Sequence, residues 1–393
     1  MTTACRVVAP GRVNLIGEHT DYNDLPVLPM AIDRTVEIEF QVLTRPEVRL
    51  KTPLRDFPPA RFSLDEDMGR APQGDWSNYP RAAAKGLLEE GISLEQGISG
   101  TVHGTVPLAA GLSSSSALVV ATSLALLHAN GHRMDPLALA ETMAKAERFV
   151  GLEGGGMDQA VCIHGRRGMA VRVDFAPLRV ARVPIPDGWR WLVAHSLIQA
   201  EKAGSAREAY NDRAATCRHA LSVLADAWSE PELTYRDLVG RPGALDDASR
   251  LLEPRVLRRF RHVLAEANRV DRAQAAMVAN DPDEFGTLMS LSHASLRDEY
   301  EVSLPALDEM VRIAEGAGAY GARLTGAGFG GCIVALCSAE SLSRVKEALL
   351  DRYYLKRPSP PAALGSSPEE WAFEVRPSDG ARVEAGSERS PWA

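Results

Sequence analysis

The chain has 393 residues, of which 45% are hydrophobic and 24% charged, the balance of a soluble globular protein long enough for two domains. It carries 52 acidic residues against 44 Lys and Arg, a net charge of -8 that argues against nucleic acid or an acidic membrane as partner. Its five cysteines form no CxxC pair, and no segment reads as a membrane span or signal peptide. A cytoplasmic protein with reduced thiols is therefore expected.

The first informative segment in chain order is 11–23, which reads GRVNLIGEHTDYN. It crowds an arginine, two acids, a histidine and two glycines together, and apolar residues follow at 27–29. This mixture is typical of a rigid turn that aims hydrogen-bonding groups at a polyhydroxylated ligand. A polar hairpin without a ligand is the plainer alternative.

The hydrophobic pattern along the chain predicts alternating strands and helices, followed by a mainly helical region. Alternation at 36–40 predicts a half-buried strand, and a second strand is expected at 100–106. The apolar run 117–127 predicts a buried helix opened by serines, and 137–150 predicts an amphipathic helix. The remaining expected strands are 169–173, 189–193 and 332–336, with mostly helices from 206 onward. This order predicts two α+β domains, residues 1–186 and 187–385, and a disordered tail at 386–393.

A loop that could hold phosphate lies at 107–117, where PLAAGLSSSSA leads directly into the predicted helix. Free backbone N–H groups and the helix dipole make such a terminus an anion site, and four serines exceed what an ordinary N-cap needs. The loop is not a Walker A motif, because no lysine follows the serines. The motifs of protein kinases are also missing from the sequence.

Two further glycine-rich segments follow. Residues 326–331, GAGFGG, formally match GxGxxG, but they precede a strand instead of a helix, so a loop packed against 107–117 fits better than a dinucleotide site. Residues 153–159, EGGGMDQ, let backbone approach a ligand closely and leave Asp158 beside it. Glu147, near the end of its helix, is either a metal ligand or half of a surface ion pair.

Together these segments resemble the three motifs of the GHMP small-molecule kinases, and specifically those of the galactokinase family. The resemblance is carried by 11–23, 112–117 and 323–332, and it extends from about residue 6 to 383 through shorter matches at 210–213, 261–266, 292–298 and 376–380. It implies two α+β domains with the active site in the cleft between them. It also implies transfer of the γ-phosphate of ATP to the anomeric hydroxyl of a galactose-type sugar.

The same resemblance implies roles for individual residues. Asp158 matches the catalytic base, and Arg12 matches the charged partner that keeps it ionised. The positions that hold the sugar are Glu18, His19, Asp21, Gly155 and Tyr210. The positions that bind ATP and its phosphates are Gly111, Leu112, Ser113, Ser114, Ser115, Trp76 and Tyr79. The Mg²⁺ ligands are Ser115 and Glu147, and the third motif contributes Thr325, Gly326, Gly328 and Gly330.

Some positions depart from the usual pattern and leave alternatives open. Leu25-Pro26 stands where many members of the family have Gly followed by an apolar residue, and Ala109 replaces a common glycine of the phosphate loop. The form GGGMDQ at 154–159 resembles plant and fungal galactokinases and N-acetylgalactosamine kinases, so an N-acetylgalactosamine kinase or a broad sugar 1-kinase is the alternative to galactose. Tyr210 favours galactose. A non-catalytic sugar and ATP sensor is the remaining alternative, disfavoured by the complete stretch 113–117. The expected partners are sugar and ATP, and the expected state is a monomer or weak homo-oligomer.

Overall fold

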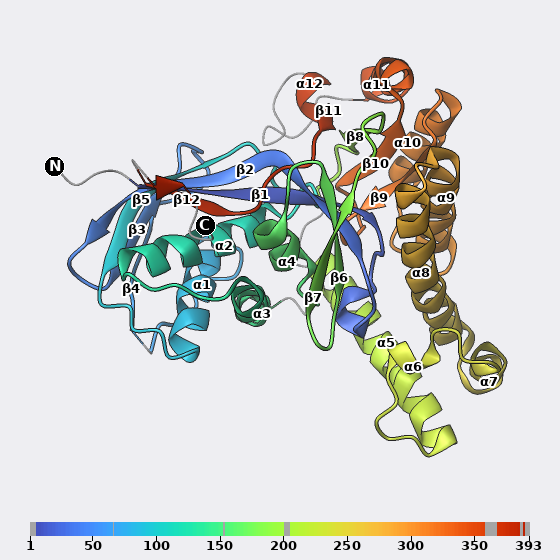
Figure 1. The fold of residues 1–393 in the computed structure, drawn as a ribbon, viewed down its shortest axis with the longest axis horizontal. Coiled ribbons are helices and arrows are strands. Elements are labelled where there is room, and N and C mark those ends of the chain that lie inside the picture. The colour runs from blue at the N-terminus through green and yellow to red at the C-terminus, as the bar shows by residue number, and fades with distance from the viewer. Residues whose placement is uncertain are drawn as a thin grey trace.

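The computed structural model describes residues 5–65, 67–151, 154–199, 205–357, 368–385 and 388–389. Figure 1 shows two lobes side by side. One is a long mixed sheet with helices packed beneath it, and the other is a smaller sheet backed by long helices. The expected two-part α+β architecture is confirmed.

The first lobe is built on a seven-stranded sheet in the order β13-β12-β1-β2-β5-β3-β4. Its strands are β1 (Cys5–Ile16), β2 (Leu28–Leu43), β3 (Glu47–Lys51), β4 (Ala60–Ser63), β5 (Gly97–Gly104), β12 (Arg382–Ala385) and β13 (Glu388–Arg389). In β2, Val36, Ile38 and Phe40 are buried while Glu37 and Glu39 are not, because successive side chains point to opposite faces. This confirms the half-buried strand expected at 36–40.

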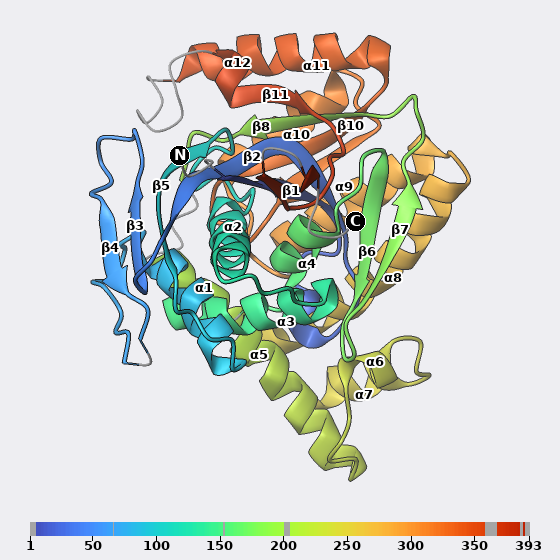
Figure 2. The ribbon, with the colours of Figure 1, turned by 60° about the vertical axis from the view of Figure 1, so that its left-hand side comes forward.

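Helices fill the space beneath this sheet. They are α1 (Asn78–Glu89), α2 (Ser114–Ala129), α3 (Pro136–Glu147) and α4 (Met157–His164). Helix α2 is apolar on every side and lies enclosed between the sheet and the other helices, as a buried helix should (Figure 2). The predicted helix at 137–150 appears as α3, which Asp135 caps, followed by the 3-10 turn η2 (Arg148–Val150).

A ribbon and a second sheet follow. The ribbon pairs β6 (Met169–Asp174) with β7 (Arg179–Pro184). The second sheet has the order β11-β8-β10-β9, with strands β8 (Arg190–His195), β9 (Gly321–Thr325), β10 (Cys332–Cys337) and β11 (Ala372–Val375). The strands expected at 169–173, 189–193 and 332–336 are thereby confirmed, whereas β9 lies in a segment that sequence reasoning treated only as a glycine loop.

The second lobe is mainly helical. Its helices are α5 (Ser205–Trp228), α6 (Tyr235–Leu238), α7 (Ala244–Leu251), α8 (Pro254–Val278), α9 (Pro282–Asp298), α10 (Pro305–Gly316), α11 (Ala339–Arg352) and α12 (Pro368–Trp371), with short 3-10 turns η1 (Asp21–Asn23) and η3 (Tyr354–Lys356). Proline occupies the first position of α8, α9 and α10, where its missing N–H costs no helical hydrogen bond.

The chain changes sheet between β7 and β8, close to the expected boundary at 186. Near its end it returns, because β12 pairs with β1 and places Val383 opposite Val7. The domain limits 1–186 and 187–385 stay predictions. Of the tail expected to be disordered, residues 388–389 form β13 against β12, and the rest lies outside the described residues.

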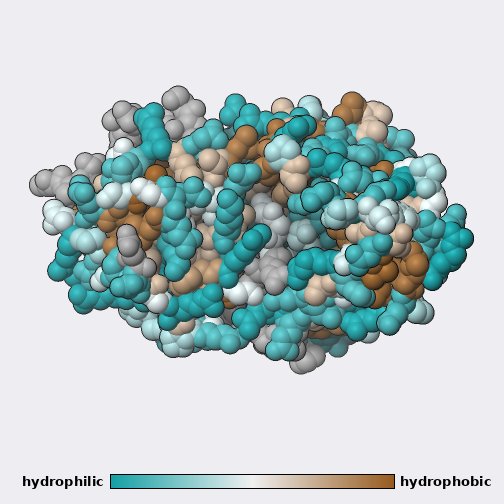
Figure 3. Space-filling view, turned by 90° about the horizontal axis from the view of Figure 1, so that it is seen from below, coloured by the Kyte–Doolittle hydropathy of each residue, from teal (hydrophilic) through white to brown (hydrophobic). Residues whose placement is uncertain are grey.

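Within the described ranges, no helix combines the length and the apolar character needed to cross a bilayer. Hydrophilic residues cover most of the face seen in Figure 3, and hydrophobic ones gather there in separate groups.

Candidate active site

The polar segment 11–23 divides between a strand and a turn. Residues 11–16 belong to β1 and pair with β2, so the prediction of a turn was wrong for this half. The turn begins at Gly17, where φ is +100° and a Cβ would lie 2.9 Å from the Cα of Val27. His19 adopts the left-handed region at φ 64°. The strand therefore supplies rigid anchorage, and the turn presents the acids and the histidine.

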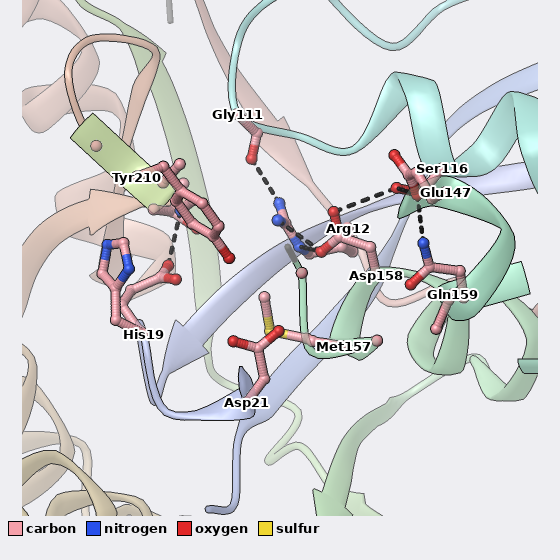
Figure 4. Close-up of a pocket in the computed structure, with 18 of the residues that line it drawn as sticks. Arg12, His19, Asp21, Gly111, Ser116, Glu147, Met157, Asp158, Gln159 and Tyr210 are labelled. Carbon is pink, nitrogen blue, oxygen red and sulfur yellow. Dashed lines mark hydrogen bonds and ion pairs between the residues drawn. The ribbon is translucent and has the colours of Figure 1, made fainter. Parts of the chain in front are cut away.

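Arg12 extends from β1 to Asp158, which lies in the first turn of α4 (Figure 4). Its Nε donates to Asp158 Oδ1 at 2.8 Å, and its Nη2 lies 2.7 Å from the same oxygen. Its Nη1 donates to the carbonyl oxygen of Gly111. Arg12 is only 4% exposed, so this ion pair is shielded from water. The contacts place a carboxylate directly beside the loop predicted to hold phosphate.

Glu18 joins the turn to the third motif. Its Oε1 accepts a hydrogen bond from the backbone N–H of Gly326 at 2.7 Å and lies 3.5 Å from Nη2 of Arg323. Burial raises the pKa of Glu18, although the positive charges of Arg323 and Arg12 oppose that rise. Thr325 strengthens the same junction, since its hydroxyl accepts from the backbone N–H of Asn14 at 3.0 Å.

Glu266 on α8 holds the turn from the other lobe. Its Oε1 accepts from the backbone N–H groups of Gly17 at 3.0 Å and Glu18 at 3.2 Å, and from Ser292 Oγ at 2.6 Å. Its Oε2 accepts from Nε of Arg269 at 2.6 Å. Burial alone would raise the pKa of Glu266, but the charges of Arg269 and Arg323 outweigh it and lower that pKa. Sequence reasoning matched Glu266 and Arg323 to the family without assigning either a role.

The predicted sugar-holding residues come together around one cavity, which Glu18, His19, Asp21 and Tyr210 line with Arg12 and Asp158. Asp21 Oδ2 accepts from the N–H of Gly155 at 3.1 Å, and a Cβ at residue 155 would lie 2.3 Å from the backbone carbon of Asp21, so only glycine fits there. The ring centroids of His19 and Tyr210 are 5.6 Å apart.

Two pKa shifts define the charge of this cavity. Burial, together with the charges of Asp158 and Glu18, raises the pKa of Asp21 to about 6. Burial lowers the pKa of His19 well below its ordinary value, so its imidazole is neutral near pH 7. A neutral imidazole and closely spaced carboxylates offer mainly acceptors, which suits a ligand rich in hydroxyl groups.

Glu147 is buried, which rules out the surface ion pair considered for it. Its Oε2 accepts from Ser116 Oγ at 2.7 Å and from the side-chain amide of Gln159. Ser116 Oγ also lies 3.4 Å from Asp158 Oδ2. Ser115, the other predicted Mg²⁺ ligand, hydrogen-bonds Tyr79 and lines a second cavity. The four-serine run indicated this cluster, but the hydrogen bonds of Glu147 to Ser116 and Gln159 were not predicted from the sequence. The assignment of Ser115 and Glu147 as Mg²⁺ ligands stays a prediction.

The second cavity is lined by the loop 108–115 together with Trp76 and Tyr79, the two aromatic residues expected near adenine. Ala109, Gly111 and Ser113 have φ of 51°, 74° and 59°, so left-handed residues alternate along the loop. Alternation of this kind turns successive N–H groups inward as an anion-binding nest. Ser113 Oγ is buried and has no hydrogen-bond partner in the described part of the chain.

The third motif packs directly on this loop, as predicted for the glycine-rich segment 326–331. A Cβ at Gly326 would lie 2.8 Å from the carbonyl oxygen of Gly111, and one at Gly331 would lie 2.8 Å from that of Ala110. Gly328 and Gly330 line the first cavity, and a Cβ on either would clash with neighbouring backbone. Backbone-to-backbone packing across the two lobes therefore requires Gly326 and Gly331, and packing within the second lobe requires Gly328 and Gly330.

Comparison with known protein families matches three segments. They are the GHMP kinases N terminal domain at 78–166, the GHMP kinases C terminal at 273–355 and the galactokinase galactose-binding signature at 2–41. The galactokinase of Chloroflexus aggregans is 39% identical over 351 residues, which cover 88% of this chain and 87% of that protein. The chain belongs to the galactokinase family. As a galactokinase family member it is a sugar kinase, for which ATP is the phosphate donor.

Further galactokinase relatives agree. That of Roseiflexus sp. is 40% identical over 353 residues, covering 88% of this chain and 87% of the relative. The crystal structure of Lactococcus lactis galactokinase complexed with galactose superposes with a TM-score of 0.84 at 29% identity, covering 96% and 94% of the two chains. A mevalonate kinase structure, at 20% identity and a TM-score of 0.63, shares the fold alone. The narrower resemblance to plant and fungal galactokinases and N-acetylgalactosamine kinases stays a prediction.

Proposed function

We propose that this protein phosphorylates the anomeric hydroxyl of galactose with ATP, giving galactose 1-phosphate and ADP. The observation that carries the proposal is the contact between the Arg12–Asp158 pair and the phosphate loop at Gly111. On one side of that contact lies the cavity with Glu18, Asp21 and Tyr210, and on the other lies the nest of the phosphate loop.

Asp158 acts on the reacting hydroxyl. As the hydroxyl oxygen forms its bond to the γ-phosphorus, the bond from that phosphorus to the β-phosphate oxygen breaks, and ADP leaves with the electron pair. The hydroxyl proton goes to Asp158, a transfer that typically contributes about 10²–10⁴-fold to the rate. Arg12 holds Asp158 in place through two contacts of 2.8 and 2.7 Å and offsets the negative charge that develops on the sugar oxygen.

Glu18, His19, Asp21 and Tyr210 bind and orient the sugar, with Gly155 leaving room for Asp21. Carboxylates accept from sugar hydroxyls, while the neutral His19 and the Tyr210 ring close the wall of the cavity. Fixed orientation matters because phosphoryl transfer depends mostly on positioning and charge neutralisation.

The second cavity takes ATP. The N–H groups at 111–115 and the start of α2 hold its phosphates, and Trp76 and Tyr79 stack or pack beside the adenine. Trp76 is fixed in place because its indole N–H donates to the carbonyl oxygen of Pro58 at 2.7 Å. Thr325 and Gly326 hold the third motif against β1, Glu18 and the phosphate loop, and Gly328 and Gly330 let that motif pack closely on Val302 and Ile198.

The residues present also fit Mg²⁺, which prefers one or two carboxylates together with substrate phosphates. Within the described residues no group of three or more His, Cys, Asp or Glu could form an all-protein metal site. Glu147 and Ser116 supply oxygen donors beside the phosphate loop, and we assign the ion to them in place of the pair Ser115 and Glu147. When bound, Mg²⁺ supplies positive charge to the phosphates.

A sugar panel tests the proposal. ADP release with Mg-ATP is measured with galactose, N-acetylgalactosamine, glucose, arabinose and galacturonate. Galactose should give the highest kcat/KM. A dominant signal with N-acetylgalactosamine would replace the substrate, and several comparable signals would indicate a broad sugar 1-kinase. The absence of ADP release with every sugar, despite ATP binding, would favour a non-catalytic sugar and ATP sensor. We further propose a monomer or weak homo-oligomer in the cytoplasm, testable by light scattering and cell fractionation.

A further inference from the structure

The two cavities meet at Gly111 and Arg207, which line both of them. A phosphoryl group that travels from ATP in the second cavity to a sugar in the first must pass this junction. Gly111 offers only backbone there, and its carbonyl oxygen is already taken by Arg12. Arg207 offers a guanidinium group.

Arg207 lies in the first turn of α5 and is half-buried. Its Nη1 is 3.1 Å from the point that a Cβ would occupy at Gly151, in the turn that follows Glu147. In the part of the chain that the structure describes, Arg207 has no ion-pair or hydrogen-bond partner. The other arginine of the first cavity, Arg12, is committed to Asp158 and Gly111.

The charge of the first cavity favours a further cation at this junction. Its lining includes four carboxylates, those of Glu18, Asp21, Glu147 and Asp158, against the two arginines. A γ-phosphate brought beside these carboxylates meets repulsion unless fixed positive charge offsets it. Guanidinium presents a planar fork of donors that matches phosphate oxygens, and the positive end of the α5 dipole adds to its charge.

We propose that Arg207 is a further catalytic residue, whose guanidinium binds the γ-phosphate during its transfer from ATP to the sugar. This inference rests on the proposed function. The bond to the sugar oxygen forms and the bond to the β-phosphate oxygen breaks while Arg207 donates to the oxygens of the moving group. The proton still goes to Asp158, and Arg207 keeps its own protons throughout.

A purely structural role for Arg207 would be to brace the turn at Gly151. The affinities for different nucleotides distinguish the two roles. A γ-phosphate contact affects ATP and its non-hydrolysable β,γ-imido analogue but leaves ADP unaffected, whereas a distorted turn changes the affinity for all three nucleotides and the melting temperature.

The experiment compares wild type, Arg207→Ala and Arg207→Lys with Arg218→Ala, an exposed position on the same helix. We expect Arg207→Ala to lower kcat by about 100-fold or more. Its affinity for the imido analogue should fall by about tenfold or more while that for ADP stays within twofold. Added guanidinium ion should restore part of the kcat of Arg207→Ala, Arg207→Lys should be intermediate, and Arg218→Ala should match wild type.

A kcat for Arg207→Ala within threefold of wild type, or equal losses of ADP and analogue affinity, would overturn the assignment. The two affinities need no turnover, so they test Arg207 even if wild type fails to act on galactose. Inactivity of the wild type with galactose would refute the proposed substrate, whereas the two affinities would still test the role of Arg207.

Discussion

Replacing Glu266 by glutamine tests how the second lobe holds the turn that begins at Gly17. The substitution keeps the shape of the side chain but removes its charge. Glu266 is fully buried and contacts Arg269 at 2.6 Å, so the change leaves a largely buried arginine without its carboxylate. Breaking a buried pair in this way costs about 3–5 kcal/mol. Arg269 keeps 12% exposure, so we expect the lower end, about 3 kcal/mol of the free energy of unfolding.

Function should fall with stability. Oε1 of Glu266 accepts from the N–H groups of Gly17 and Glu18, so a weaker acceptor loosens the turn that carries the proposed sugar ligands. We expect kcat/KM for the sugar to drop by about tenfold or more, because small misplacements at a reacting centre are costly. The matched control is Glu284→Gln. Glu284 forms an ion pair with Arg272, and these side chains are 36% and 59% exposed, respectively. That control should lower the free energy of unfolding by under about 1 kcal/mol.

Urea unfolding of wild type and the two variants measures these differences from the shift in midpoint. The pH dependence of the free energy of unfolding is a second measurement. The pKa of folded Glu266 lies below the 4.5 of an ordinary glutamate, so its stabilisation is fully present above pH 4.5 and is lost only as the pH falls further. If Glu266→Gln costs no more than Glu284→Gln at pH 7, the role assigned to this carboxylate is refuted.

Three further outcomes are expected. Asp21, with its pKa raised from 3.8 to about 6, should lose acceptor strength as the pH falls from 7 to 5, so KM for the sugar rises; Asp21→Asn should flatten that profile. Its ionisation between about pH 4 and 6 also costs the folded state stability, the opposite sign to Glu266. Ser116→Ala should raise the Mg²⁺ concentration for half-maximal activity by about 10–100-fold, and a larger effect of Ser115→Ala would restore the sequence-based assignment. Ala109→Gly should relieve left-handed strain of about 1–2 kcal/mol against an entropic cost of about 0.4–1, and urea unfolding showing clear destabilisation would contradict this.

Local patterns predicted the elements whose residues are close in sequence. The buried helix α2 and the alternating strand β2 follow from short-range periodicity. The glycines at 326–331 indicated close packing against the phosphate loop. The rotation of α2 about its axis is different, because contacts with α3 and α4 decide which serine donates to Glu147, and Ser116 does so in the structure. One turn of helix carries no signal for that choice when all four candidates are serine.

Contacts across long stretches of sequence were also beyond local reasoning. Glu266 meets Gly17 across 249 positions, and Arg323 meets Glu18 across the interface of the two lobes. The return of β12 to β1 depends on where the sheet edge lies, which no local pattern states. The family resemblance pointed to Arg12 and Asp158, which the structure shows as an ion pair, and the structure added the residues that surround that pair.

The most direct test of the central claim is galactose-dependent ADP release by Asp158→Asn beside wild type, with galactose binding measured on the same samples. The substitution removes the proton acceptor but preserves the side-chain shape and one oxygen that can face Arg12. We predict a fall in kcat of about 10²–10⁴-fold with galactose affinity within a few-fold of wild type. Near-normal turnover by Asp158→Asn would contradict the account.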